Sequence, residues 1–300
     1  MNKFFKKSCL FIILLAICFS AFVLICYLCG RYEKNLSSNN IYIWGDSQAY
    51  QGVILSDLAR ITNKDVLSAA THGAGVYDLL VFANRVPSQS ICIVSYSQCC
   101  LLRRKSADFN GSGVDIDALY SLYNQHYTIK ELFQICTNNY FSKKCIFRIE
   151  DSNLYDYLPY IIYPEPLSGF EKMYQTIPAF YNDKYDLFCQ ALQIMKSKQC
   201  QVILIAFPYY ETTYEVYKQS PFSDILDQDI LQASNILNVD KIDTLYFNDM
   251  DSLCMHDLTH LNNVGAQRTT KIIGNYVNEK LPMSENAFLI FNAWKCSALD

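Results

Sequence analysis

Three polar residues, one near the start of the chain and two near its end, have the types that nucleophilic catalysis requires. A serine hydroxyl is a weak nucleophile unless a histidine takes its proton and a third group orients the imidazole. The chain has 300 residues and only four histidines, and one of these, His260, follows Asp257 by three positions. Ser47, with His260 as its base and Asp257 as the orienting group, could therefore attack the carbonyl of an ester.

The residues around Ser47 predict that this serine lies on a turn between a strand and a helix. Residues 41–44 are apolar and β-branched or aromatic, which is typical of a short buried strand, and Gly45 and Asp46 follow them. After Ser47, apolar residues recur at steps of three and four, as on a helix with one buried face. These residues are Tyr50, Val53, Ile54, Leu58 and Ile61. In open α/β sheets such turns lie at the carboxyl edge, where ligands bind, and free N–H groups at a helix start can stabilise an oxyanion.

Two short motifs contain these residues: Gly-Asp-Ser at 45–47, after the first strand, and Asp-x-x-His at 257–260, before the last helix. Together they resemble the first and last sequence blocks of the SGNH (GDSL-like) hydrolase superfamily. The resemblance implies that Ser47 is the nucleophile, His260 the base and Asp257 the residue that orients it. It also implies an α/β fold, a three-layer α/β/α sandwich with a central parallel sheet, that needs no cofactor. Each motif alone is an ordinary turn or helix entry, so the prediction depends on their joint order.

The resemblance implies further donors to an oxyanion besides the backbone N–H of Ser47. A predicted strand at 66–70 runs into Thr-His-Gly-Ala-Gly, where the family has a glycine whose N–H binds the oxyanion. Gly73 or Gly75 matches that glycine, and an ordinary glycine turn is the alternative.

The block after the third predicted strand, at 90–95, departs from the family. The family has a Gly-x-Asn-Asp-like block there whose asparagine also donates to the oxyanion, whereas this chain reads Ser-Tyr-Ser-Gln at 95–98. Gln98 offers the same carboxamide on a longer stem, and Ser97 offers a hydroxyl. Either side chain could replace the asparagine, and loss of one such donor lowers a rate by about 10²–10³.

The remaining pattern completes one α/β domain at 41–281. Residues 201–207 form the clearest buried parallel strand, and 243–247 a weak last strand. Helices are predicted at 77–86, 185–198 and 223–237, and Asn262 or Asn263 can cap the last one. Residues 282–300 form a tail without an assigned role.

A long insertion, at about 103–184, interrupts this domain. Aromatic residues are dense in its second half, namely Tyr155, Tyr157, Tyr160, Tyr163, Phe170 and Tyr174. One interpretation is a cap over the site that stacks sugar rings, and the other is ordinary core packing with half-exposed tyrosines.

The N-terminus, residues 1–30, is predicted to be an uncleaved signal anchor. Residues 9–29 are apolar except for one serine, and 21 residues at 1.5 Å each span about 31 Å, one bilayer core. Lys3, Lys6 and Lys7 precede this run and favour an N-terminus in the cytoplasm. Residues 31–40 would then be a linker, and the domain would lie outside the cytoplasm. The alternative is a cleaved signal peptide, which gives the same compartment without the tether.

The net charge argues against nucleic acid as a partner, and the residue types argue against a metal site. The formal net charge is −4, which argues against nucleic acid as a partner. His256 and His260 lie four positions apart with Asp257 between them, but no third cluster of metal ligands is evident, so no metal is predicted.

Two functional hypotheses follow. The first is a membrane-anchored serine esterase or O-acyltransferase that acts on an acyl ester, an acetyl ester above all, of an envelope glycan. The second is a protein that keeps this fold but has weakened catalysis, and that binds a glycan or serves as a scaffold. The altered block at 95–98 favours the second hypothesis, and the presence of Ser47, Asp257 and His260 favours the first.

Overall fold

The computed structural model describes residues 36–96, 98–102, 114–140, 147–151, 177–243 and 252–280, and single residues between 8 and 21. The predicted tail and most of the predicted anchor at 9–29 lie outside these residues. Within the described part of the chain, no helix is long and apolar enough to span a bilayer.

A sheet of five parallel strands lies at the centre of the described residues, in the order β2-β1-β3-β4-β5. Strand β1 lies in its interior, with Ile41 opposite Val66 of β2 and Ile91 of β3. The strands are β1 (Ile41–Trp44), β2 (Val66–Ser68), β3 (Ile91–Ser95), β4 (Gln201–Ala206) and β5 (Asp240–Asp243). The prediction that the first four belong to one parallel sheet is confirmed.

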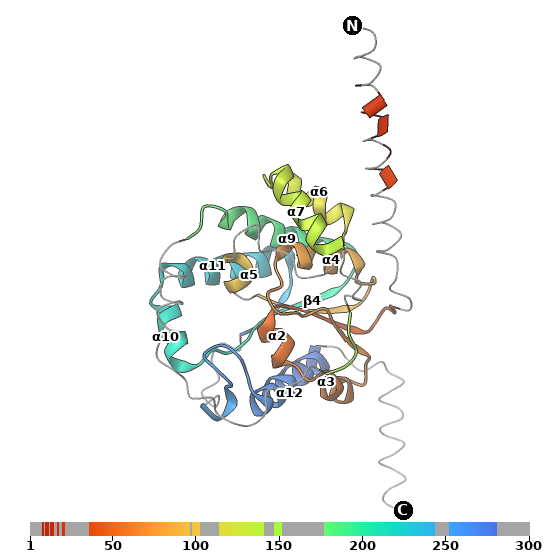
Figure 1. Cartoon of the computed structure of the whole chain (residues 1–300). Helices are drawn as coiled ribbons and strands as arrows, with labels where there is room; N and C mark the ends of the chain where they lie inside the picture. Colours follow the sequence, from red (N-terminus) through yellow and green to blue (C-terminus); the bar gives the residue numbers. More distant parts are fainter. Residues whose placement is uncertain are drawn as a thin grey trace, which may run out of the picture.

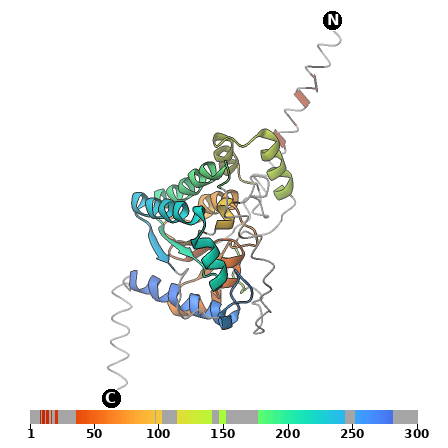
Figure 2. The same ribbon diagram turned by 90° about the vertical axis from the view of Figure 1, so that its left-hand side faces the viewer.

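Helices cover both faces of this sheet, which gives the predicted three layers (Figure 1). Successive side chains of β1 point to opposite faces, so Tyr42 and Trp44 join one hydrophobic cluster while Ile41 and Ile43 join the other. The first cluster includes residues of α4 (Val76–Arg85), α5 (Gln98–Leu102), α9 (Tyr181–Ser197) and α11 (Pro221–Leu237). The second includes residues of α2 (Ser47–Gly52), α3 (Leu55–Thr62) and α12 (Asn263–Lys280). Figure 2 shows α12, in blue, on the opposite side of the sheet from α9, in green.

The chain after Ser47 forms two helices where the sequence predicted one. Val53 and Ile54 adopt extended dihedral angles between α2 and α3 (φ −130°, ψ 125° and φ −90°, ψ 106°). Both residues are β-branched, which lowers their preference for a helix. The N–H of Ile54 donates instead to Thr270 Oγ1 of α12, at 3.0 Å. Helix α2 is therefore a short element of six residues that begins at Ser47.

Two further elements differ from the sequence prediction. Strand β5 begins at Asp240, three residues before the predicted strand at 243–247, and it is an edge strand with charged residues that lacks an apolar run. Residues 244–247 of the predicted strand lie outside the described residues. Helix α10 (Glu211–Lys218) was not predicted, since its polar sequence has no continuous apolar stripe, although Thr213, Tyr214 and Tyr217 are buried.

The described parts of the insertion pack against the domain. Helix α6 (Ile116–Asn124) contacts α4, and α7 (Ile129–Tyr140) contacts α6. Residues 147–151 lie beside the edge strand β2, where Arg148 forms an antiparallel bridge with Ser68. Most of the tyrosine-rich stretch, at 152–176, lies outside the described residues, so its predicted role as a cap stays a prediction.

Candidate active site

The turn between β1 and α2 is held by close packing and by a cap. Asp46 is the N-cap of α2, and its carboxylate accepts a hydrogen bond from the Gln48 N–H at 3.0 Å. A Cβ on Gly45 would lie 2.4 Å from Cβ of Ala49 and 2.6 Å from Cβ of Ser95. Glycine is needed here for space, and not for a left-handed backbone, because Gly45 does not have a positive φ. The turn leaves the half-buried Ser47 as the first residue of α2.

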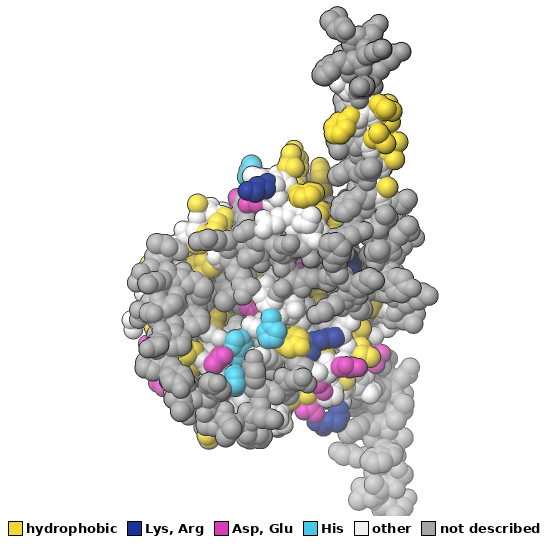
Figure 3. Space-filling model, in the orientation of Figure 1, with side chains coloured by type: hydrophobic (Ala, Val, Ile, Leu, Met, Phe, Trp, Pro, Cys, Tyr) yellow, Lys and Arg dark blue, Asp and Glu magenta, His cyan; other side chains and the backbone are white. Residues whose placement is uncertain are grey.

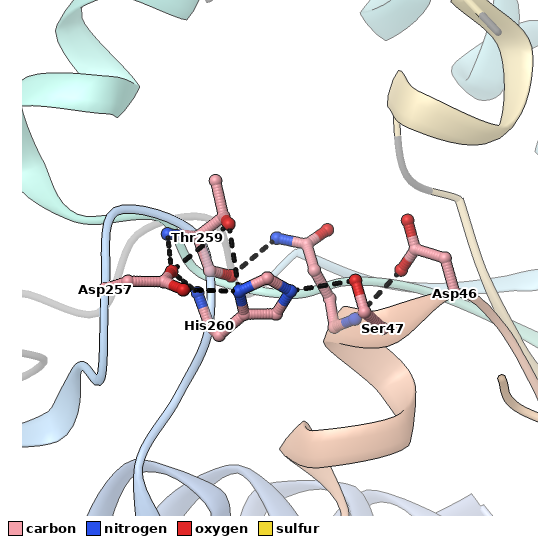
Figure 4. A network of polar contacts seen from close by, with 6 residues as sticks. Asp46, Ser47, Asp257, Thr259 and His260 are labelled. Atoms are coloured by element: carbon pink, nitrogen blue, oxygen red, sulfur yellow. Dashed lines mark hydrogen bonds and ion pairs between the residues drawn. The ribbon is translucent and has the colours of Figure 1, made fainter. Parts of the chain in front are cut away.

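The three residues that the sequence singled out lie together at the carboxyl edge of the sheet (Figure 4). Oγ of Ser47 lies 2.8 Å from Nε2 of His260, across a sequence separation of 213 residues. Nδ1 of the same ring lies 2.7 Å from Oδ2 of Asp257. Both distances are those expected for a nucleophile, its base and an orienting carboxylate.

The Asp257 carboxylate is stabilised by donors from its own loop. Its Oδ1 accepts hydrogen bonds from the backbone N–H groups of Thr259 and His260, both at 2.8 Å. Burial alone would raise the pKa of Asp257, but the hydrogen bond from the His260 ring, the charge of that ring and these two N–H groups lower the pKa to about 2. A carboxylate with these partners is ionised at neutral pH and holds the Nδ1 proton of the imidazole in place.

The loop that carries Asp257 and His260 is a tight hairpin. Met255 and Leu261 form an antiparallel bridge at its base. Asn262 donates from Nδ2 to the carbonyl of Leu253 at 2.7 Å, while its Oδ1 accepts from the N–H groups of Val264 and Gly265 at the start of α12. The prediction that Asn262 caps the last helix is confirmed. Because one side chain both caps α12 and binds the hairpin, the histidine loop is fixed to the helix behind it.

A buried glutamine, which the sequence analysis missed, links the nucleophile helix to this loop. Gln48 Nε2 donates to the carbonyl oxygen of Thr259 at 3.0 Å. The bond joins the residue after the nucleophile to the residue before the base. No periodicity or motif marks Gln48 as different from any other polar residue in a helix, so only the structure could reveal its role.

The two glycines predicted as oxyanion donors differ in the hydrogen bonds that their N–H groups make. The N–H of Gly75 donates to Asp78 Oδ2 at 3.0 Å as part of the N-cap of α4, so it is already bonded. Gly73 is buried with φ of 72°, and its N–H has no acceptor within the described residues. The loop lies beside the nucleophile turn, because the Thr71 N–H donates to the carbonyl of Gly45 at 3.0 Å.

The structure does not describe the side chains of the other two predicted donors. Ser97 lies outside the described residues, and Gln98 begins α5 just beyond the carboxyl end of β3. Both therefore stay predictions, and the backbone N–H groups of Ser47 and Gly73 are the donors on which the site can be built.

Two other histidines lie near the triad and are largely uncharged at neutral pH. Partial burial, with the charge of His260, lowers the pKa of His72 against an opposing effect of Asp46. Burial also lowers the pKa of His256, against the raising effect of Asp257. No group of three or more metal-ligating side chains occurs among the residues that the structure describes.

Comparisons with known proteins find no family model, no curated relative and two distant solved structures. No protein-family model and no curated protein matches the chain. Among solved structures, a proposed acylhydrolase from Bacteroides fragilis is similar with a TM-score of 0.40 and 8% identity, covering 83% of this chain and 97% of that one. The protein YxiM from Bacillus subtilis is similar with a TM-score of 0.40 and 11% identity, covering 79% of this chain and 55% of that one. At these values neither similarity bears on the chemistry of the site.

The substitution Gln48→Ala should loosen the histidine loop. It removes the donor to the Thr259 carbonyl and should lower the free energy of unfolding by about 1 kcal/mol. Hydrogen exchange of the backbone amides at 256–260 should become faster. Gln51→Ala is the matched control, since Gln51 is a buried glutamine of the same helix whose Oε1 has no partner. Equal exchange in both variants would contradict the role assigned to Gln48.

The low pKa of Asp257 predicts a specific dependence of stability on pH. A folded-state pKa of about 2, against the usual 3.8, means that the ionised carboxylate stabilises the fold above about pH 4. This contribution is lost as the pH falls toward 2. The difference in free energy of unfolding between the wild type and Asp257→Asn should therefore be largest above pH 4 and should shrink between pH 4 and 2. A difference that does not change over this range would contradict the assignment.

Proposed function

We propose that the chain is a serine ester hydrolase or O-acyltransferase of the SGNH (GDSL-like) type. The observation that carries this proposal is the continuous hydrogen-bonded series from Ser47 through His260 to Asp257. The five-stranded parallel sheet with helices on both faces and the Gly-Asp-Ser turn support it as well.

The proposed reaction begins with proton transfer from Ser47 to Nε2 of His260, as Oγ attacks the ester carbonyl carbon. The carbonyl oxygen becomes an oxyanion near the N–H groups of Ser47 and Gly73. The tetrahedral intermediate then collapses, the bond to the alcohol oxygen breaks, and His260 returns the proton to that oxygen. Asp257 keeps the other ring proton on Nδ1 throughout and stabilises the imidazolium.

The acyl-enzyme is released by the same chemistry in reverse. Water in a hydrolase, or a sugar hydroxyl in an acyltransferase, gives its proton to His260 and attacks the acyl carbon. Ser47 then leaves with the proton restored. The orientation of the base is common to both outcomes, so the geometry of the triad fits hydrolysis and transfer equally.

We also propose that the substrate is an acyl ester, such as an acetyl ester, of an envelope glycan, and that the domain lies outside the cytoplasm on an N-terminal membrane anchor. The apolar run at 9–29, the lysines before it and the short linker at 31–40 support the anchor. The tyrosine-rich stretch of the insertion supports a sugar substrate, since aromatic side chains can stack on sugar rings.

The alternative function is that of a glycan-binding or scaffold protein with weakened catalysis. The altered block at 95–98 favours it, because the asparagine that would donate to the oxyanion is absent. The geometry of Ser47 and His260 favours the enzyme, since a serine without a catalytic role has no need of an oriented imidazole.

Labelling with a fluorophosphonate probe separates the two functions. The wild type should be labelled, Ser47→Ala should not, and His260→Ala should react at least about 10³-fold more slowly. Ser56→Ala is the matched control. Ser56 is an exposed serine of α3 that bonds to Asp151 and should not react with the probe, so this variant should be labelled as the wild type is. A folded wild type that is not labelled would favour the binding or scaffold function.

The proposed topology is tested by reporter fusions. A reporter that acts only outside the cytoplasm should be active when fused after Asp300, and a reporter that acts only in the cytoplasm should be inactive there. The same pair fused after Lys7, before the apolar run, should give the opposite result. Activity of the cytoplasmic reporter after Asp300 would overturn the proposal.

A further inference from the structure

One turn of α2 beyond the nucleophile, Tyr50 forms a stack with two side chains that the proposed mechanism does not use. Its ring centre lies 4.7 Å from that of His72 and 4.0 Å from the guanidinium carbon of Arg148. Figure 3 shows histidine side chains gathered on this face, with apolar and basic side chains beside them. The stack begins about 4.5 Å along the helix axis from Ser47, so a bound ester could reach it.

The segment that carries Arg148 is fixed at both ends, which makes its position specific. The backbone of Arg148 exchanges two hydrogen bonds of 2.8 Å with Ser68 of β2. Three residues later, the Asp151 carboxylate accepts from the N–H and the hydroxyl of Ser56, at 3.2 and 2.6 Å, at the start of α3. A side chain held between two such contacts needs little reordering to bind a ligand.

The guanidinium of Arg148 is a half-buried charge without an acidic partner among the described residues. It donates to the carbonyl oxygens of Tyr50 and Glu150, at 3.1 and 3.3 Å. Its Nε is buried and has no hydrogen-bond partner. The carboxylate of Asp151, whose charge raises the pKa of Arg148, already accepts two hydrogen bonds from Ser56. Burial lowers the pKa of Arg148, but an arginine with its usual pKa above 12 stays charged at neutral pH.

A purely structural role accounts for only part of this arrangement. The bond to the Tyr50 carbonyl satisfies an acceptor near the end of α2, as basic side chains at helix ends often do. A guanidinium has five N–H donors in a planar fork that matches carboxylate and phosphate groups. Because two carbonyls take only two of them and no described carboxylate accepts a hydrogen bond from the guanidinium, the site favours an added anion.

We propose that Arg148, with Tyr50 and His72, forms a subsite for an oxyanion group on the alcohol part of the ester that Ser47 attacks. The inference rests on the proposed esterase or acyltransferase function. Since an acetyl group is neutral, the negative charge must lie on the glycan, so the substrate is an acetyl ester of an acidic glycan that bears carboxylate or phosphate groups. The neutral His72 adds a ring surface and a hydrogen-bonding nitrogen without a competing charge.

Matched pairs of acetyl esters test the subsite. The carboxylate pair is 4-acetoxybenzoate and its neutral methyl ester, and the phosphate pair is acetylglycerol phosphate and acetylglycerol. For each pair the ratio of kcat/KM, anionic over neutral, is measured in the wild type and in Arg148→Gln. The wild-type ratio should exceed one for at least one pair, and Arg148→Gln should lower it by roughly ten- to hundred-fold. The pair that responds identifies the source of the charge.

The controls separate a subsite from general electrostatic or structural effects. Arg60→Gln removes an exposed arginine that pairs with Asp57 on α3, so it matches the change in net charge and should leave the ratio as in the wild type. Arg148→Lys keeps the charge but loses the planar fork, so it should lower the ratio of kcat/KM less than Arg148→Gln does. It also serves as the test if Arg148→Gln does not fold.

Two results would overturn the inference in distinguishable ways. Turnover of all esters with a ratio that Arg148→Gln and Arg148→Lys leave unchanged would remove the subsite and leave the esterase function intact. Absence of turnover of every ester, together with absence of fluorophosphonate labelling at Ser47, would remove the proposed function and the subsite with it.

Discussion

The contact between the first helices and the last helix is the constraint on which the site depends, because Ser47 and His260 belong to opposite ends of the chain. A Cβ on Gly274 of α12 would lie 2.6 Å from a side-chain carbon of Ile61, so α12 packs directly on α3. Asn278 donates to the carbonyl of Ile61, and Thr270 accepts from the N–H of Ile54. With α12 held in this way, the loop at its start can occupy only a small range of positions over the nucleophile turn, and the bond from Gln48 selects one of them.

The charged groups of the site have two different uses. The carboxylates orient neighbouring groups, whereas one cation could bind a ligand. Asp46 and Asp257 accept backbone N–H groups of their own turns, so each carboxylate is used locally. His72 and His256 are largely neutral at pH 7, since partial burial lowers the pKa of each. Arg148 lies over the ring of Tyr50 in α2, and its positive charge is hydrogen-bonded to two carbonyl oxygens and to no described carboxylate. A ligand with a negative charge at this place could accept hydrogen bonds from the guanidinium that no described carboxylate accepts.

The sequence was sufficient for those features that depend on short, continuous patterns. The runs at 41–44, 90–95 and 201–207 predicted the interior strands, and two motifs located Ser47, Asp257 and His260 before any distance was known. The start of edge strand β5 at Asp240 could not be predicted, because its charged residues form no apolar run, and residues 244–247 of the predicted strand lie outside the described residues. Gln48 and Arg148 could not be predicted, since a single polar residue acquires its role from a partner distant in the sequence, here Thr259 for Gln48 and the ring of Tyr50 for Arg148.

The break between α2 and α3, which the sequence did not predict, and the position of Arg148 have one physical cause. A break in a helix leaves carbonyl groups without partners on one side and N–H groups without partners on the other. Arg148 donates to the Tyr50 carbonyl at the end of α2, and Asp151 accepts the Ser56 N–H at the start of α3. One short segment of the insertion therefore satisfies both sides of the break. The donor that satisfies the Tyr50 carbonyl is a guanidinium, so this contact also places a positive charge within about one helical turn of Ser47.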